Sequence, residues 1–125
     1  MPGTILVVED NAMNMRLMVE LLSHFGYDVL EAGNGLQAMM LVHQHHVDLI
    51  LMDMQMPIMN GFECVKMLRT NEKTAKIKIV AVTSFAMEED QKRIFETGVD
   101  ELILKPFNTR EFSKRIEQIL ERITK

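Results

Sequence analysis

Four short apolar runs in this chain each end in a polar side chain. The runs are residues 5–8, 49–52, 79–82 and 102–104, and the residues that follow them are Glu9 with Asp10, Asp53, Thr83 and Lys105. Continuous apolar runs of this length, separated by helix-period segments, are typical of parallel strands buried on both faces. In open α/β sheets, ligands bind beyond the carboxyl ends of the strands. The pattern therefore predicts that these polar side chains converge on one site.

Strand-like and helix-like stretches alternate about five times along the chain. The predicted strands are residues 5–8, 27–32, 47–52, 77–82 and 102–105, and the predicted helices are 12–25, 34–45, 62–69, the segment between 88 and 98, and the segment after 108. This alternation predicts an α/β protein with a (βα)5 doubly wound parallel sheet. The flavodoxin-like strand order 2-1-3-4-5 would place the first and third strands side by side, so that Glu9, Asp10 and Asp53 become neighbours.

Length and charge narrow the class of protein. The 125 residues fit a single domain, residues 1–125. Fourteen basic and eighteen acidic residues give a net charge of −4, and no basic run stands out, so we expect neither a nucleic-acid partner nor membrane binding. No signal-peptide pattern or bilayer-length apolar stretch is present, and we therefore expect a cytoplasmic protein. Cys64 falls in an apolar helical pattern and is predicted to be a buried structural thiol.

The three predicted neighbours are all carboxylates. Two unit charges about 4 Å apart repel by roughly 4 kcal/mol at an effective dielectric constant of 20, so Glu9, Asp10 and Asp53 require a cation. Hard oxygen ligands with room left for water favour Mg²⁺. The sequence therefore predicts a magnesium site at this edge of the sheet.

The sequence resembles a response-regulator receiver domain of two-component signalling, of the chemotaxis-receiver type, and the resemblance covers the whole chain. It rests on four motifs in chain order, each after a predicted strand: residues 8–11 (Val-Glu-Asp-Asn), 51–61, 82–84 (Val-Thr-Ser) and 105–107 (Lys-Pro-Phe). No effector segment follows the receiver-like sequence, which fits either a stand-alone regulator or a receiver excised from a larger protein.

The resemblance implies a phosphoacceptor signalling switch and not a turnover enzyme. Asp53 would be the residue that takes a phosphoryl group from a histidine kinase or a histidine phosphotransfer protein. Thr83 would hydrogen-bond one phosphoryl oxygen, and Lys105 would neutralise another. The Lys105–Pro106 peptide bond would be cis, as is usual in the family.

The resemblance also implies a set of metal ligands. Glu9 and Asp10 would hold Mg²⁺ with Asp53, directly or through water, and the backbone carbonyl of Gln55 would complete the shell. This set agrees with the physical interpretation, because phosphoryl transfer has a charge-spread transition state that positioning and electrostatics stabilise.

Each of these residues also has an ordinary structural interpretation. An acidic pair after a strand is usually a solvated turn, and a lone aspartate such as Asp53 is often a helix cap. Thr83 alone could be a β-branched strand residue, and Lys105 alone an edge lysine. Their coincidence at one predicted sheet edge favours the functional site.

Three other functional classes use related residues. A haloacid-dehalogenase-type phosphatase normally needs a second aspartate two residues after the nucleophile, where this chain has Gln55. A flavodoxin-type electron carrier needs a neutral phosphate loop after the first strand, where Glu9 and Asp10 would repel the phosphate. A binding-only pseudo-receiver generally lacks part of the acidic set, which is complete here.

The chain departs from the family in its last strand, and two further residues lie at positions that in the family flank the path of the hydrolysing water. Family members commonly carry an aromatic residue three positions before the lysine, where this chain has Leu102, so a smaller movement of the loop 83–85 is the alternative to the usual switch. Gln55 and Phe85 lie two residues beyond Asp53 and Thr83, and neither is acidic. We therefore expect slow self-dephosphorylation, because no base orients the hydrolysing water.

The first helix is predicted to carry the docking surface for the phosphodonor. Its apolar residues sweep an arc of about 240°, wider than a core-facing stripe requires, and Met15 and Val19 lie at the far edge of that arc. The alternative is that the last helix covers this flank.

His43 and His46 share a helix face and raise the hypothesis of a second metal site. Polar residues are ordinary near a helix C-terminus, however, so this spacing also has a structural interpretation.

Overall fold

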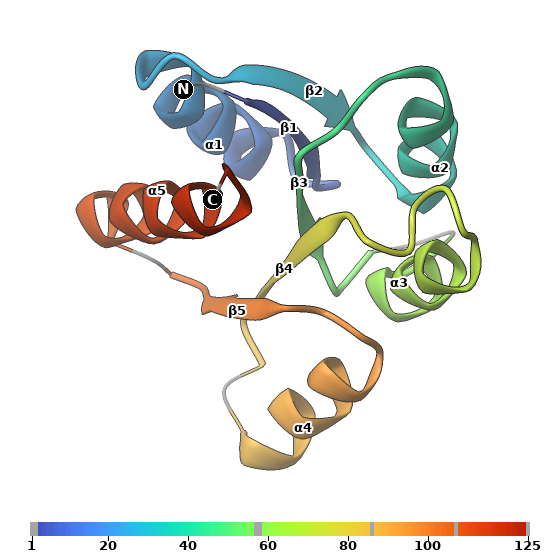
Figure 1. Cartoon of the computed structure of the whole chain (residues 1–125). Helices are drawn as coiled ribbons and strands as arrows, with labels where there is room; N and C mark the ends of the chain where they lie inside the picture. The colour runs from blue at the N-terminus through green and yellow to red at the C-terminus, as the bar shows by residue number, and fades with distance from the viewer. Residues whose placement is uncertain (1–2, 57–58, 86, 107, 125) are drawn as a thin grey trace.

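A computed structural model describes residues 3–56, 59–85, 87–106 and 108–124 of the chain. Pro57, Ile58 and Phe107, which belong to the motifs above, lie outside the described residues. The elements alternate in the order β1 (Thr4–Val8), α1 (Ala12–His24), β2 (Asp28–Ala32), α2 (Gly35–Gln44), β3 (Leu49–Asp53), α3 (Gly61–Thr70), β4 (Lys78–Thr83), α4 (Glu88–Glu96), β5 (Glu101–Leu104) and α5 (Thr109–Thr124). The strands form one parallel sheet in the order 2-1-3-4-5 (Figure 1), which confirms the predicted fold class.

The sheet lies between two layers of helices. Helices α1 and α5 cover one face, and α2, α3 and α4 cover the other (Figure 1). Because side chains alternate along a strand, Ile5 and Val7 of β1 belong to the core under α1 and α5, and Leu6 and Val8 belong to the core under the other three helices. Both faces of the central strands are therefore buried, which explains their unbroken apolar runs.

Asparagine side chains define where several helices begin. Asn11, Asn34 and Asn60 each accept a hydrogen bond from the backbone N–H three residues later, at the starts of α1, α2 and α3. Such a bond satisfies one of the N–H groups that the first helical turn leaves free. The helix starts at these positions agree with the sequence pattern to within a residue or so.

The ends of the strands differ from the prediction by one or two residues. The N–H of Tyr27 bonds to Leu22 at the end of α1, and the N–H of Ile77 bonds to Thr74 in a turn, so neither residue joins the sheet. Lys105 lies just past β5 instead of ending it. Backbone hydrogen bonding, and not hydropathy, decides these boundaries.

The apolar flank of α1 is not the one predicted from the sequence. Met15 is buried, and Val19 is half-buried against the core that α1 shares with α5. The large apolar side chains that α1 exposes are Met13 and Leu17, which are 82% and 40% accessible. The prediction for Met15 is therefore wrong, because the packing of α1 against the sheet turns that residue inward.

Helix α5 is amphipathic and packs its apolar face against the sheet. Among the side chains of α5 that the structure describes, the buried ones are Phe112, Ile116, Ile119 and Leu120, which pack on the same face of the sheet as α1. No helix in the described part of the chain is long and apolar enough to cross a membrane. In α3, Cys64 is buried as predicted, and burial raises the pKa of its thiol to about 11.

Candidate functional site

Three carboxylates gather at the carboxyl edge of the sheet. Val8 of β1 is paired with Met52 of β3, so the residues that follow them, Glu9 and Asp53, lie at neighbouring strand ends. A carboxylate oxygen from each of Glu9, Asp10 and Asp53 lies within 4.8 Å of the others. Glu9 and Asp53 are buried, whereas Asp10 is exposed. The cluster therefore has a closed interior and one side open to solvent.

Lys105 reaches the same cluster from the far edge of the sheet. Its Nζ atom lies 2.9 Å from Oε1 of Glu9 and 3.7 Å from Oδ2 of Asp53. The backbone N–H of Lys105 also bonds to the carbonyl of Thr83 at 2.8 Å, which fixes the start of this loop against the end of β4. The Lys105–Pro106 bond is cis, as the resemblance implied.

Asp53 is held in an environment that favours its neutral form. Burial is the largest cause and raises the pKa of Asp53 to about 7, and the neighbouring Glu9 carboxyl adds to the rise. The backbone N–H of Gln55 donates a 3.0 Å hydrogen bond to Oδ1 of Asp53, and this bond and the Lys105 ammonium act in the opposite direction on the pKa. A nearby cation would therefore be needed to ionise Asp53 fully at neutral pH.

The loop after β3 lies very close to the start of α3. A Cβ atom on Gly61 would come within 2.6 Å of the carbonyl oxygen of Asp53 and of the Cα atom of Met54. No side chain larger than hydrogen fits there without a shift of the backbone. Gly61 therefore lets α3 begin directly against the residue at the end of β3.

Thr83 ends β4 beside this cluster and is fully buried. Its Oγ1 accepts a 3.1 Å hydrogen bond from the N–H of Phe85 and lies 3.4 Å from Oε1 of Gln55. The same Gln55 oxygen accepts hydrogen bonds from Oγ and N–H of Ser84, at 2.8 and 3.3 Å. The sequence predicted a place for Thr83 at this edge, but it gave no signal for the contact between Gln55 and Ser84, which are 29 positions apart.

The donor set fits a hard divalent cation. Three carboxylates face one ammonium group, so negative charge is in excess, and carboxylate oxygens are the ligands that Mg²⁺ takes.

The histidines are placed differently: Nε2 of His46 lies 2.9 Å from Oδ1 of Asp48, at the opposite end of β3. Among the described residues, no histidine belongs to a group of three that could hold a metal ion.

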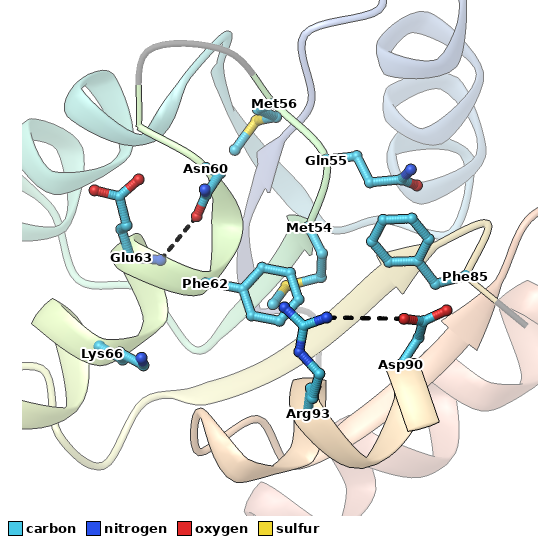
Figure 2. Close-up of a pocket in the computed structure, with 10 residues that line it drawn as sticks. All are labelled: Met54, Gln55, Met56, Asn60, Phe62, Glu63, Lys66, Phe85, Asp90 and Arg93. Carbon is cyan, nitrogen blue, oxygen red and sulfur yellow. Dashed lines mark hydrogen bonds and ion pairs between the residues drawn. The ribbon is translucent and has the colours of Figure 1, made fainter. Parts of the chain in front are cut away.

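A pocket of about 650 Å³ adjoins the site between α3 and α4 (Figure 2). Its walls include Met54, Met56, Phe62, Phe85 and Gln55. The guanidinium carbon of Arg93 lies 5.6 Å from the centre of the Phe62 ring, and Nη1 of Arg93 lies 4.0 Å from Oδ1 of Asp90. Gln55 and Phe85 lie at one end of the pocket in Figure 2, so the pocket and the acidic site share a wall.

Leu102 occupies the β5 position where the family often has an aromatic residue. It is partly buried and packs against the core on the side of α2, α3 and α4. Its carbonyl accepts a 2.8 Å hydrogen bond from Nη1 of Arg115 in α5. The side chain thus fills core space instead of presenting a ring to solvent.

The chain has clear relatives. Residues 5–117 match the family model of the response regulator receiver domain. The polar-differentiation response regulator DivK of Brucella anthropi is 39% identical over 120 residues, which cover 96% of this chain and 98% of DivK.

Solved structures agree with this match. The receiver domain of sensor histidine kinase PA1611 from Pseudomonas aeruginosa, a structure with a magnesium ion coordinated in the active site cleft, is 29% identical, has a TM-score of 0.87, and is aligned over 100% of both chains. The chemotaxis protein CheY4 of Vibrio cholerae is 26% identical with a TM-score of 0.89, over 95% of this chain and 99% of CheY4.

Proposed function

The chain belongs to the response regulator receiver family of two-component signalling, and on that premise we propose that Asp53 accepts a phosphoryl group from a histidine kinase or a histidine phosphotransfer protein. The single observation that carries the proposal is the buried Asp53 carboxyl beside Glu9, Asp10 and Lys105 at the end of β3. The whole chain, residues 1–125, would act as one cytoplasmic receiver domain that signals or relays through protein contacts.

The proposed reaction is a direct phosphoryl transfer. A carboxylate oxygen of Asp53 forms a bond to the phosphorus atom of a phosphohistidine. The P–N bond breaks, its electron pair returns to the imidazole ring, and the ring takes up a proton from water. The product is an acyl phosphate on Asp53, and the neutral imidazole is the leaving group.

We propose that Glu9, Asp10 and Asp53 hold Mg²⁺, with the backbone carbonyl of Gln55 as a further ligand. When bound, Mg²⁺ would neutralise charge on the transferring phosphoryl group. The magnesium ion in the cleft of the PA1611 receiver domain supports this assignment, as does the excess of carboxylates over ammonium groups in this chain.

Thr83 and Lys105 would contact the phosphoryl group once it is attached. Thr83 has a hydroxyl that can donate one hydrogen bond to a phosphoryl oxygen. Lys105 already faces Asp53 at 3.7 Å and would neutralise another oxygen. Positioning by these residues would let the chain assist its own phosphorylation and dephosphorylation, as a switch and not as a turnover enzyme.

Intact mass after reaction with acetyl phosphate and Mg²⁺ tests the proposal. The wild-type chain should gain one phosphoryl group, and Asp53→Asn and Asp53→Ala should gain none. Asp48→Asn is the matched control, because Asp48 precedes β3 at the opposite end of the sheet, where it accepts a hydrogen bond from the N–H of Thr4. Phosphate on another carboxylate in Asp53→Ala would overturn the assignment.

A further inference from the structure

The side-chain amide of Gln55 holds the loop that follows β4. Its Oε1 atom lies 2.8 Å from Oγ of Ser84, 3.3 Å from N of Ser84 and 3.4 Å from Oγ1 of Thr83. We call these three hydrogen bonds the Gln55 latch. They join the loop after β3 to the loop after β4, two segments that are remote in the sequence.

The latch uses the only proton that the Thr83 hydroxyl can donate. A threonine hydroxyl has one O–H donor and two acceptor lone pairs. One lone pair already accepts the N–H of Phe85 at 3.1 Å, and the O–H group is directed to Oε1 of Gln55. A new acceptor near Thr83 can therefore receive this proton only if the bond to Gln55 breaks.

A group attached to Asp53 would reach these same donors. Asp53 is paired with Val82 in the sheet, and the N–H of Met54 bonds to the carbonyl of Val82 at 3.2 Å. Thr83 and Ser84 are the next residues along β4 and its loop, so they lie beside whatever extends from Asp53 beyond the sheet edge. Gln55 follows Asp53 by two residues, and its backbone N–H donates a 3.0 Å hydrogen bond to Oδ1 of Asp53.

We infer that the Gln55 latch competes with the phosphoryl group for the donors of Thr83 and Ser84, and so weakens the phosphorylated state. The inference rests on the proposed function. Phosphorylation exchanges a neutral amide acceptor for a charged phosphoryl oxygen, which is the stronger acceptor. Replacing the amide acceptor by the phosphoryl oxygen is favourable overall. The net gain is smaller, however, because the hydrogen bonds of the latch must first be broken.

Release of the latch also changes the pocket between α3 and α4. Gln55 and Phe85 form one end of that pocket (Figure 2), and Phe85 donates its N–H to Thr83. A Thr83 hydroxyl that turns to a phosphoryl oxygen therefore alters both residues of this wall. The latch therefore links the phosphorylation state of Asp53 to the wall of this pocket, and the link does not require an aromatic side chain at position 102.

Beryllofluoride, which mimics a phosphoryl group on a carboxylate, measures the competition directly. In saturating Mg²⁺, Gln55→Met should bind beryllofluoride about threefold to tenfold more tightly than the wild type. The substitution removes the hydrogen bonds that stabilise the unliganded state and leaves the beryllofluoride-bound state unchanged, and the factor corresponds to the net contribution of one typical hydrogen bond. Methionine keeps the length of the side chain and leaves the backbone groups of Gln55 in place. Gln118→Met makes the same change at an exposed position of α5 and should bind as the wild type does.

A double-mutant cycle separates the latch from a merely structural role. Ser84→Ala removes the shortest of the three bonds, so Gln55→Met should add less affinity in that background than alone. Unchanged or weaker binding by Gln55→Met, or an equal gain in both backgrounds, would overturn the latch. A wild-type chain that binds no beryllofluoride would refute the proposed function itself, and the latch with it.

Discussion

Lys105 donates a 2.9 Å hydrogen bond to Glu9, although 96 positions separate the two residues in the chain. The same ammonium group lies 3.7 Å from Asp53. One cation therefore faces two buried carboxyl groups, and a negative charge is left uncompensated when both are ionised. Burial is the largest cause of the raised pKa of Asp53, and Glu9 adds to the rise against the smaller opposing effect of Lys105.

The first prediction concerns pH and stability without metal. The folded-state pKa of Asp53 is about 7, above the ordinary value of 3.8, so the folded chain binds the proton more tightly than the unfolded chain. The stability that this proton contributes is present below about pH 4 and is lost as the pH rises through about 7. Asp53→Asn should therefore be more stable than the wild type at pH 8 in chelator, by on the order of 2–4 kcal/mol.

Urea unfolding at pH 4, 6 and 8 in chelator checks this prediction. The difference between Asp53→Asn and the wild type should grow with pH and shrink again when Mg²⁺ is added at pH 8. A constant difference across the three pH values would mean that the charge on Asp53 does not limit stability.

The second prediction is that Mg²⁺ stabilises the fold modestly and is not required for folding. A site at tenfold excess of ligand over its Kd gains about 1.4 kcal/mol from binding. The chain should thus unfold cooperatively in chelator, with a lower midpoint than in Mg²⁺. Loss of cooperative unfolding in chelator would contradict the prediction.

Asp10→Asn provides a matched variant for the magnesium prediction. Asp10 is the exposed member of the acidic cluster, so its loss should cost little stability in chelator. The same variant should lose most of the stabilisation that Mg²⁺ gives the wild type. An undiminished response to Mg²⁺ would remove Asp10 from the proposed ligand set.

The third prediction concerns the lifetime of the acyl phosphate. Phe85 is half-buried two residues after Thr83, and neither it nor Gln55 offers a base to a hydrolysing water. Phe85→Ala should shorten the half-life of the phosphorylated chain several-fold, because it exposes the acyl phosphate to water. Phosphoprotein remaining after removal of acetyl phosphate, followed by intact mass, gives the half-life.

Phe62→Ala is the control for Phe85→Ala. Phe62 lines the same pocket from α3 and contacts Arg93 rather than the acidic site. Its loss should leave the half-life unchanged. Equal half-lives for Phe85→Ala and the wild type would argue against shielding by the ring.

The fourth prediction moves the kinase-docking hypothesis to Met13 and Leu17, the apolar residues that α1 exposes. Met13→Glu and Leu17→Glu should each slow phosphoryl transfer from a histidine kinase or phosphotransfer protein by about tenfold, equivalent to about 1.4 kcal/mol of docking free energy. Phosphorylation by acetyl phosphate should not change. Radiolabelled transfer from the phosphorylated donor protein measures the first rate, and intact mass measures the second.

Met67→Glu is the comparison for the α1 variants. Met67 is 45% accessible and lies on α3, on the opposite face of the sheet. This variant should accept phosphate from the protein donor at the wild-type rate. If all three variants slow transfer equally, a general effect of charge, and not docking on α1, is the cause.

Much of the fold and the place of the site were predictable from local patterns. The apolar runs in β1, β3 and β4 are long enough to specify buried parallel strands, and parallel strands bring their carboxyl ends to one edge. The polar residue after each strand was therefore bound to lie at that edge. The strand order followed, because right-handed crossovers leave few arrangements.

Side-chain rotation within elements was not predictable in the same way. The apolar arc of α1 is wider than the face that the core requires, so hydropathy alone did not decide between Met15 and Met13. The packing of α1 against the sheet and α5 buries Met15 and exposes Met13. Which apolar face of a helix is buried depends on its packing against neighbouring elements, and the spacing of apolar residues along the helix does not predict it.

The sequence by itself determined which chemical groups meet: three carboxylates, a hydroxyl and an ammonium, each placed at a strand end by continuous apolar runs that alternate with helix-period segments. Only the tertiary structure decided how those groups interact. The depth of burial raises the pKa of Asp53, and the paths of two loops bring Gln55 to Ser84. Desolvation and hydrogen-bond geometry depend on distances of a few ångströms between remote segments, and the order of residues along the chain does not specify such distances.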